Sequence, residues 1–158
     1  MDFLLCILLI AADQFTKYLA VLHLKGQPAI PIVRDVLELN YLENRGAAFG
    51  MLQDQKVFFV FVAVVIAAVI AWILFIMPDQ RKYVLPHILL VMIASGAIGN
   101  MIDRLRLDYV VDFISFVLIH FPIFNVADIY VTTATFLVAV LLLFYYKEED
   151  LHFLGIWH

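Results

Sequence analysis

Four long apolar segments dominate this chain of 158 residues and restrict what it can fold into. Each is about 20 residues long, the length that an α-helix needs to cross the hydrocarbon core of a bilayer. The chain is 65% hydrophobic and 15% charged, which is more apolar surface than a soluble core of this size can bury. We therefore predict an all-α membrane protein, a single domain over residues 1–158, with transmembrane helices at residues 3–24, 57–77, 84–102 and 126–146. No basic region precedes the first segment, so we expect a retained helix rather than a removed signal.

Charge and cysteine content exclude several classes of function. The net charge is −4 and there is no run of basic residues, which argues against a nucleic-acid partner. Cys6 is the single cysteine, so neither an internal disulfide nor a cysteine-built metal site can form. The histidines show no metal-binding spacing; they are His23, His87, His120, His152 and His158. We accordingly expect no metal and no cofactor.

The stretch between the first two apolar segments, residues 25–56, contains two prolines and mixed charges. Within it, residues 36–42 alternate between apolar and polar side chains, the period of a half-buried strand. We predict a small β-like cradle over about residues 30–50. Its last part, residues 44–50, holds two glycines and two alanines. These small residues either let a peptide or lipid pass close to the backbone, or form a plain loop that closes the strand.

Residues 105–125 are too polar at their start, and too broken by Pro122, to cross a membrane. They still contain a long apolar run, which predicts either a strand or an interfacial, partly re-entrant segment between the third and fourth helices. Non-helical backbone at membrane depth is tolerated only beside protein or a water-filled cavity. We therefore expect a cavity next to this segment.

Several of the scarce charged residues interrupt the apolar segments. Asp13 and Lys17 are four residues apart, hence on one face of a helix, and should point into the bundle or into a wet cavity. They form either a structural ion pair between helices or a brace for a functional site. Asp103 and Arg104 are adjacent rather than on one face, so we expect their partners to lie on other segments.

Asp112 and Asp128 are the candidates for chemistry, because carboxylates near the bilayer are costly unless they have partners or water. Two carboxylates in contact cannot both ionise easily, so one holds a proton and the pair supplies an acid and a base together. We predict that they meet in a membrane-facing cleft, share one proton and form an aspartyl peptidase site. The position of Asp128 at the start of a helix favours its charged form. The apolar residues around Asp112 in the sequence favour the neutral form of Asp112.

Other interpretations of these residues stay open at this level. Asn125 is a candidate N-cap, so Asp128 could simply complete a capping box. Intramembrane charges also build small proton-coupled transporters or channels, and they join helices in non-enzymatic assembly factors. A serine–lysine site would require Lys17 to reach Ser95 or Ser115.

Five motifs in order resemble those of bacterial lipoprotein signal peptidases (signal peptidase II). They are Asp13-Gln-Phe-Thr-Lys17, Asn44-Arg-Gly-Ala-Ala-Phe-Gly50, Gly99-Asn-Met-Ile-Asp-Arg104, Val110-Val-Asp-Phe113 and Phe124-Asn-Val-Ala-Asp128. The resemblance covers essentially the whole chain and implies catalytic roles for Asp112 and Asp128. It also implies supporting roles for Asp13, Lys17, Asn44, Gly46, Asn100, Asp103, Arg104, Asn125 and Ala127.

The resemblance further implies a four-helix aspartyl endopeptidase of the bacterial inner membrane, with both termini cytoplasmic and the site toward the outer face. Such enzymes cut prolipoproteins just before a diacylglyceryl-modified cysteine and are inhibited by the cyclic peptide globomycin. We expect lipid-modified signal peptides and membrane lipids as partners, and a monomer. A count of lysines and arginines alone would instead place the acidic site on the cytoplasmic side. This chain also departs from the family, with Leu107-Asp108 where a glycine is usual and a short interval between the two aspartates.

Overall fold

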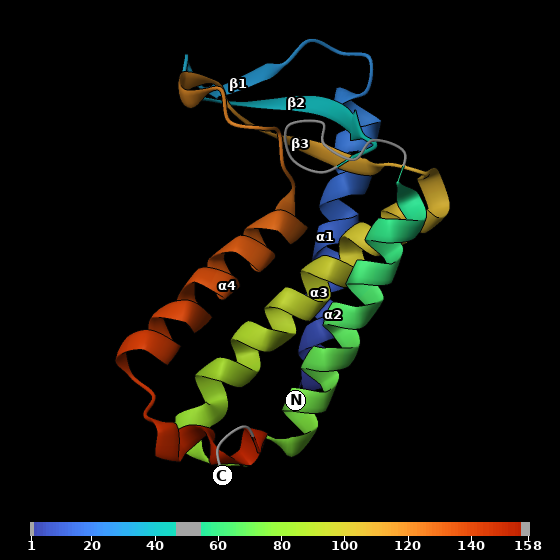
Figure 1. The fold of residues 1–158 in the computed structure, drawn as a ribbon. Coiled ribbons are helices and arrows are strands. Elements are labelled where there is room, and N and C mark those ends of the chain that lie inside the picture. The colour runs from blue at the N-terminus through green and yellow to red at the C-terminus, as the bar shows by residue number, and fades with distance from the viewer. Residues whose placement is uncertain (1, 47–54, 156–158) are drawn as a thin grey trace.

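A computed structural model describes residues 2–46 and 55–155 of the chain. Four long helices run from one end of the molecule to the other, and a small sheet covers one of these ends (Figure 1). The helices are α1 (Asp2–Leu24), α2 (Lys56–Ile76), α3 (Val84–Leu107) and α4 (Val126–Phe144). The strands are β1 (Ile30–Val33), β2 (Leu37–Asn44) and β3 (Val110–Phe116), and the short 3₁₀ turns are η2 (Arg81–Tyr83), η3 (Val117–Ile119) and η4 (Glu148–Leu154).

All four helices are long and apolar enough to cross a membrane, which confirms the predicted fold class. The predicted end of α3 at residue 102 is too early, because the helix continues to Leu107. It ends at Asp108, whose φ of 67° lies in the left-handed region that glycine adopts most easily. Asp108 belongs to the Leu107-Asp108 pair that stands where the resemblance implies a glycine.

Close packing of α3 against its neighbours depends on two glycines. A Cβ atom at Gly96 would lie 2.5 Å from the carbonyl oxygen of Ala127 on α4. A Cβ atom at Gly99 would lie 2.6 Å from Oδ2 of Asp13 on α1. Small residues at helix contacts let backbones approach closely in a bilayer. Here they bring polar groups on three helices into hydrogen-bonding range.

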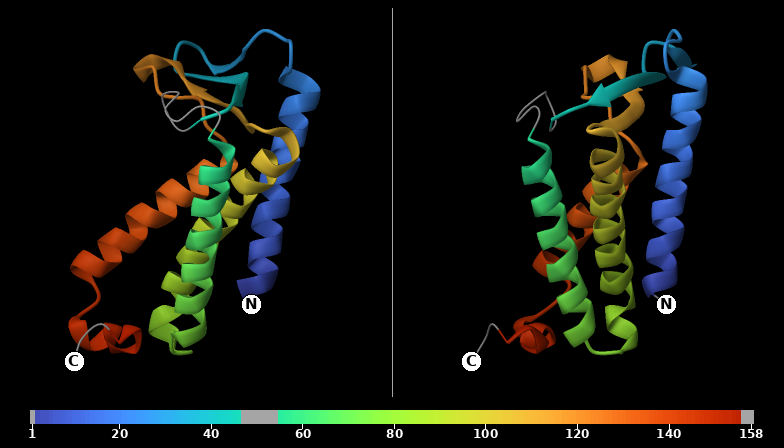
Figure 2. Two further views of the ribbon diagram at one scale, coloured as in Figure 1. Left: turned by 45° about the vertical axis from the view of Figure 1, so that its right-hand side comes forward. Right: turned by 90° about the vertical axis from the view of Figure 1, so that its right-hand side faces the viewer.

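The sheet is antiparallel, with strand order β1-β2-β3, and it lies across the end of the bundle (Figure 2). The strand predicted over residues 36–42 is confirmed as β2. Of the two possibilities for the segment after α3, its first part, Val110–Phe116, is the strand β3. One face of the sheet packs on the last turns of α1, through Val111 and Phe113 against Ala20 and Leu24. Residues 47–50 of the small-residue run lie outside the described residues.

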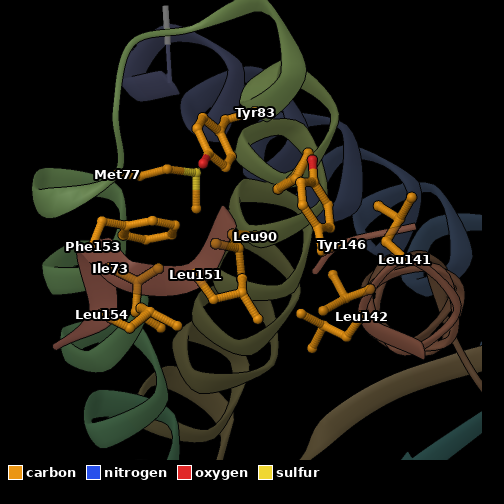
Figure 3. Close-up of a pocket in the computed structure, with 12 residues that line it drawn as sticks. Ile73, Met77, Tyr83, Leu90, Leu141, Leu142, Tyr146, Leu151, Phe153 and Leu154 are labelled. Atoms are coloured by element: carbon orange, nitrogen blue, oxygen red, sulfur yellow. The ribbon is translucent and has the colours of Figure 1, made fainter. Parts of the chain in front are cut away.

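The opposite end of the bundle holds an apolar cavity. There η4 lies against α2, α3 and α4 around a cavity of about 130 Å³ lined by aliphatic and aromatic side chains (Figure 3). Tyr83 stacks on Tyr146 at a ring distance of 5.9 Å and packs edge-on against Phe153 at 5.5 Å. The Tyr83 hydroxyl donates to the carbonyl oxygen of Asp150 at 2.7 Å, which holds η4 in place.

Candidate active site

Asp112 and Asp128 line the same cavity, which has a volume of about 540 Å³ and lies beneath the sheet. Asp112 comes from β3, and Asp128 comes from the first turn of α4. The cavity that we expected beside the segment after α3 is therefore present. It joins a strand and a helix that each contribute one carboxylate.

Asp112 is 1% exposed, and both of its carboxylate oxygens accept hydrogen bonds from amide groups. Asn44 Nδ2 donates to Oδ2 at 2.8 Å, and Asn125 Nδ2 donates to Oδ1 at 2.6 Å. Burial raises the pKa of Asp112 to about 7; the nearby charge of Asp128 adds to this, while the two amide donors oppose it. Asp112 can therefore hold or release a proton near neutral pH.

Asp128 belongs to the capping box predicted at the start of α4. Asn125 N donates to Asp128 Oδ2 at 3.1 Å, and Asp128 N donates to Asn125 Oδ1 at 3.0 Å. The second carboxylate oxygen of Asp128 accepts from Asn100 Nδ2 at 2.8 Å. Asp128 can therefore cap α4 and line the cavity at the same time, because its Oδ2 takes part in the capping box while its Oδ1 accepts from Asn100.

The amides of Asn100 and Asn125 link the two carboxylates. Asn125 uses its oxygen on the Asp128 backbone, so its Nδ2 faces Asp112 and also Asn100 Oδ1, at 3.1 Å. Asn100 Oδ1 accepts from both Asn125 and Lys17, at 3.1 and 2.8 Å, so only its Nδ2 remains for Asp128. The orientation of each amide is therefore determined by its partners.

Lys17 is the buried charge that determines the orientation of Asn100. Its ammonium group lies 3.0 Å from Asp13 Oδ2, 3.0 Å from Asp103 Oδ2 and 2.8 Å from Asn100 Oδ1. Gln14 adds hydrogen bonds to Asp13 and Asp103, at 3.2 and 2.9 Å; it is a supporting residue that the sequence analysis missed. The Asp13–Lys17 pair therefore joins α1 to α3, and its contacts extend to Asn100, which lines the cavity.

The carboxylates of Asp13 and Asp103 each hold the backbone next to a candidate catalytic residue. Asp13 Oδ1 accepts from the backbone N–H of Ala127, at 3.0 Å, one residue before Asp128. Asp103 Oδ2 accepts from the backbone N–H of Val111, at 3.1 Å, one residue before Asp112. The partners of Asp103 lie on other segments, as predicted. Lys17, Asp13 and Asp103 thus form a buried cluster that holds the backbone beside Asp112 and Asp128.

Arg104 and Gly46 meet at another side of the cavity. The Arg104 guanidinium donates to the Gly46 carbonyl oxygen at 3.1 Å and lies 4.5 Å from the ring centre of Phe59 on α2. Gly46 N donates to Asn44 Oδ1 at 2.9 Å, which leaves the Nδ2 group of that asparagine for Asp112. All eleven residues predicted for the site therefore lie in the cavity or in the hydrogen-bond network around it.

The wall of the cavity was not predicted as part of the site. It consists of aromatic and aliphatic side chains after Asp112 and of two threonines one turn after Asp128; the set includes Phe116, Ile119, Phe121, Phe124, Thr132 and Thr133. The helical spacing of the threonines from Asp128 was a usable signal, but the wall residues before α4 follow no period. His120 does not line this cavity. In residues 2–46 and 55–155, no group of three His, Cys, Asp or Glu side chains could hold a metal ion.

Comparisons with known proteins point to one family. The model of the signal peptidase (SPase) II family matches residues 5–144. A lipoprotein signal peptidase of Caldanaerobacter subterraneus is 44% identical, over 84% of this chain and 88% of its own length. One from Streptococcus pyogenes is 42% identical, over 91% of both chains.

Solved structures agree with this assignment. A bacterial membrane enzyme superimposes with a TM-score of 0.79 at 28% identity, over 92% of this chain and 94% of the other. The family match covers the four helices and the sheet together with both cavity aspartates. This chain is therefore a multi-pass bacterial membrane protein that belongs to the signal peptidase II family.

Proposed function

We propose that this protein is an aspartyl endopeptidase that removes the signal peptide from diacylglyceryl-modified prolipoproteins, cutting just before the lipidated cysteine. The observation that supports it most is the pair of aspartates in one cavity with unlike surroundings. Asp112 is buried under the sheet with a pKa near 7, whereas Asp128 lies at the positive end of the α4 dipole. A carboxylic acid and a carboxylate side by side are what water-mediated amide hydrolysis needs.

In the proposed reaction, Asp128 accepts a proton from a water molecule as the water oxygen forms a bond to the scissile carbonyl carbon. Protonated Asp112 donates a hydrogen bond to the carbonyl oxygen. When the carbon–nitrogen bond breaks, the amine nitrogen takes up a proton from the aspartate pair. The products are a carboxylic acid and an amine, and the pair again holds one proton. Since the two groups are coupled, their apparent pKa values belong to the pair.

The lining of the cavity suits the two parts of this substrate. The lining combines amide and carboxylate groups with aromatic and aliphatic side chains. We infer that the extended signal peptide lies along the sheet near β2, while the lipid chains of the modified cysteine lie against the apolar side chains and between the helices. The same cavity would hold globomycin-like cyclic peptides.

We also infer the placement in the cell. The start of α1 and the segment after α4 lie at the end opposite the sheet (Figure 1). With the sheet on the outer face of the cytoplasmic membrane, both of these ends are cytoplasmic. The protein would act there as a monomer, because one chain contributes both aspartates.

The decisive experiment is cleavage of a lipidated precursor by purified protein in detergent. We expect Asp112→Asn and Asp128→Asn each to lower the cleavage rate by about 10²–10⁴-fold or more, since each removes an acid or base. Asp108→Asn is the matched control, because Asp108 is an exposed aspartate outside the cavity lining, and it should leave the rate near that of the parent. Cleavage that survives in either cavity variant would rule out the pair.

A chelator provides an independent test of the mechanism. The proposed reaction uses only water and side chains, so the rate should be unchanged after incubation with EDTA. A rate that falls on chelation and returns with added metal would replace the two-aspartate mechanism with a metal-dependent one.

A further inference from the structure

The turn that leads from β3 toward α4 exposes large apolar side chains. Leu118 and Ile119 are each 66% exposed, and Phe121 is 50% exposed. From residue 113 to residue 127 the chain contains no Asp, Glu, Lys or Arg. A cluster of this kind at the tip of a turn is unusual for a surface that faces water and is typical of an interaction surface. We call residues 117–121 the apolar turn.

The apolar turn has a defined backbone. His120 N donates to Val117 O at 3.1 Å, and Phe121 N donates to Phe116 O at 3.2 Å. Val117 N donates to Val36 O at 3.0 Å, which ties the turn to the start of β2. The projection of these side chains is therefore a consequence of the fold, because backbone hydrogen bonds hold the turn that carries them.

The position of the apolar turn points to its partner. The turn lies at the end of the strands, beside the connection between β1 and β2, on the side toward which α4 leans (Figure 1 and the left view of Figure 2). Ile129 on α4 is 41% exposed and lines the same cavity as Ile119 and Phe121. Apolar side chains of the turn and of the membrane-length helix α4 therefore border one cavity. A bilayer that surrounds α4 would meet these side chains at that border.

Charges near the turn lie on its other side. Arg34 and Asp35, in the connection between β1 and β2, have side chains that are 93% and 90% exposed. Arg34 and Asp35 are close to the turn, because the next residue, Val36, accepts a hydrogen bond from Val117 N of the turn. Apolar groups beside a charged, solvated rim form the arrangement of an interfacial segment, with the charges at headgroup level and the apolar side chains deeper.

We propose that the apolar turn inserts into the bilayer, so that lipid rather than water borders the cavity wall at Ile119 and Phe121. The turn is then a second membrane contact, in addition to the four helices. One consequence rests on the proposed function: the acyl chains of a lipid-modified substrate can move from the bilayer into the cavity without crossing water.

Depth-dependent fluorescence quenching tests this proposal. The full chain carries two tryptophans, so the background is Trp72→Phe with Trp157→Phe, and a single tryptophan is placed by Leu118→Trp. The protein is reconstituted in phosphatidylcholine vesicles that contain lipids brominated on the acyl chain or spin-labelled on the headgroup. Asp35→Trp in the same background is the matched control, since it reports the charged side of the same end of the sheet.

We expect Leu118→Trp to emit at shorter wavelength than Asp35→Trp, and to be quenched about twofold more strongly by acyl-chain bromine. Asp35→Trp should respond to the headgroup label and to acrylamide in the water. Equal acrylamide quenching of both variants, with no response of Leu118→Trp to bromine, would overturn the proposal. Cleavage of lipidated precursor on the same vesicles tests the proposed peptidase function separately. The quenching experiment measures the depth of residue 118 without any turnover, so insertion of the turn and peptidase activity can fail independently.

Discussion

The two cavities of this protein lie at opposite ends of one helix bundle and differ in what surrounds them. The larger, of about 540 Å³, holds two carboxylates whose oxygens are all hydrogen-bonded by amides. The smaller, of about 130 Å³, is lined by aliphatic and aromatic side chains (Figure 3). Buried polar groups specify geometry because each needs a partner in one orientation, whereas apolar contacts are not directional. A substitution at the first cavity should therefore change chemistry, and one at the second should change stability alone.

The largest effect is expected at the buried ammonium beneath the first cavity. Lys17→Met leaves Asp13 and Asp103 without their shared cation, and breaking a buried ion pair costs about 3–5 kcal/mol. We expect a large fall in thermal stability in detergent, together with loss of cleavage.

A companion variant separates stability from chemistry. Lys17→Met combined with Asp13→Asn and Asp103→Asn removes the unpaired charges and should recover much of the melting temperature. It still lacks the donor that orients Asn100 toward Asp128, so cleavage should stay low. A triple variant with full activity would show that Lys17 only stabilises the fold.

The pH dependence of cleavage is the next largest effect. The proposed mechanism needs protonated Asp112, whose pKa of about 7 is set mainly by burial. The rate should fall by about tenfold per pH unit well above that value.

Replacing Asn44 tests whether this fall in rate at alkaline pH, the alkaline limb of the rate profile, is due to Asp112. Asn44→Ala removes a hydrogen bond that lowers the pKa of Asp112, so the pKa rises further. The alkaline limb of the rate profile should then move to higher pH, by about half a unit to one unit. A limb that moves to lower pH, or stays in place, would assign it to another group.

A smaller effect is expected at the apolar cavity. Phe153→Ala removes an aromatic partner of Tyr83 and should lower the free energy of unfolding by about 1 kcal/mol. The cleavage rate should remain within about twofold of the parent, because Phe153 lies at the opposite end of the bundle from the candidate active site. A fall in rate without a fall in stability would show that the two ends of the bundle are coupled.

The smallest effect is expected at Asp108, which belongs to the Leu107-Asp108 pair where the resemblance implies a glycine. Asp108→Gly relieves a positive φ of 67° but removes the ion pair with Lys56, whose nitrogen lies 2.6 Å from Oδ1. Exposed pairs contribute little and glycine suits this backbone, so the melting temperature should rise slightly. Lys56→Gln removes the pair alone and should lower the melting temperature slightly. A melting temperature of Asp108→Gly below that of the parent would show that the lost pair outweighs the relief of the backbone.

Local sequence patterns predict several elements of this fold. Alternation over residues 36–42 corresponds to β2, and the Asn125–Asp128 spacing corresponds to the capping box. Charges after residue 102 resemble the end of a membrane span, but α3 continues to Leu107, and the first of them, Asp103, is buried and hydrogen-bonded by Gln14 and Val111. The cavity wall at Phe116 and Thr132 was not predicted, because its members belong to separate elements and share no period.

The sequence by itself determined four membrane-length apolar helices, the strand that begins near residue 36, the family and the identities of the polar residues, because hydrophobicity, periodicity and motifs are local properties of a chain. Only the tertiary structure decided how those polar residues are used. Asn44 is 68 residues from Asp112, and Ala127 is 114 residues from Asp13, yet each pair is joined by one hydrogen bond. The direction of an amide or the partner of a buried ammonium depends on groups that folding brings from elsewhere, so no local pattern contains it.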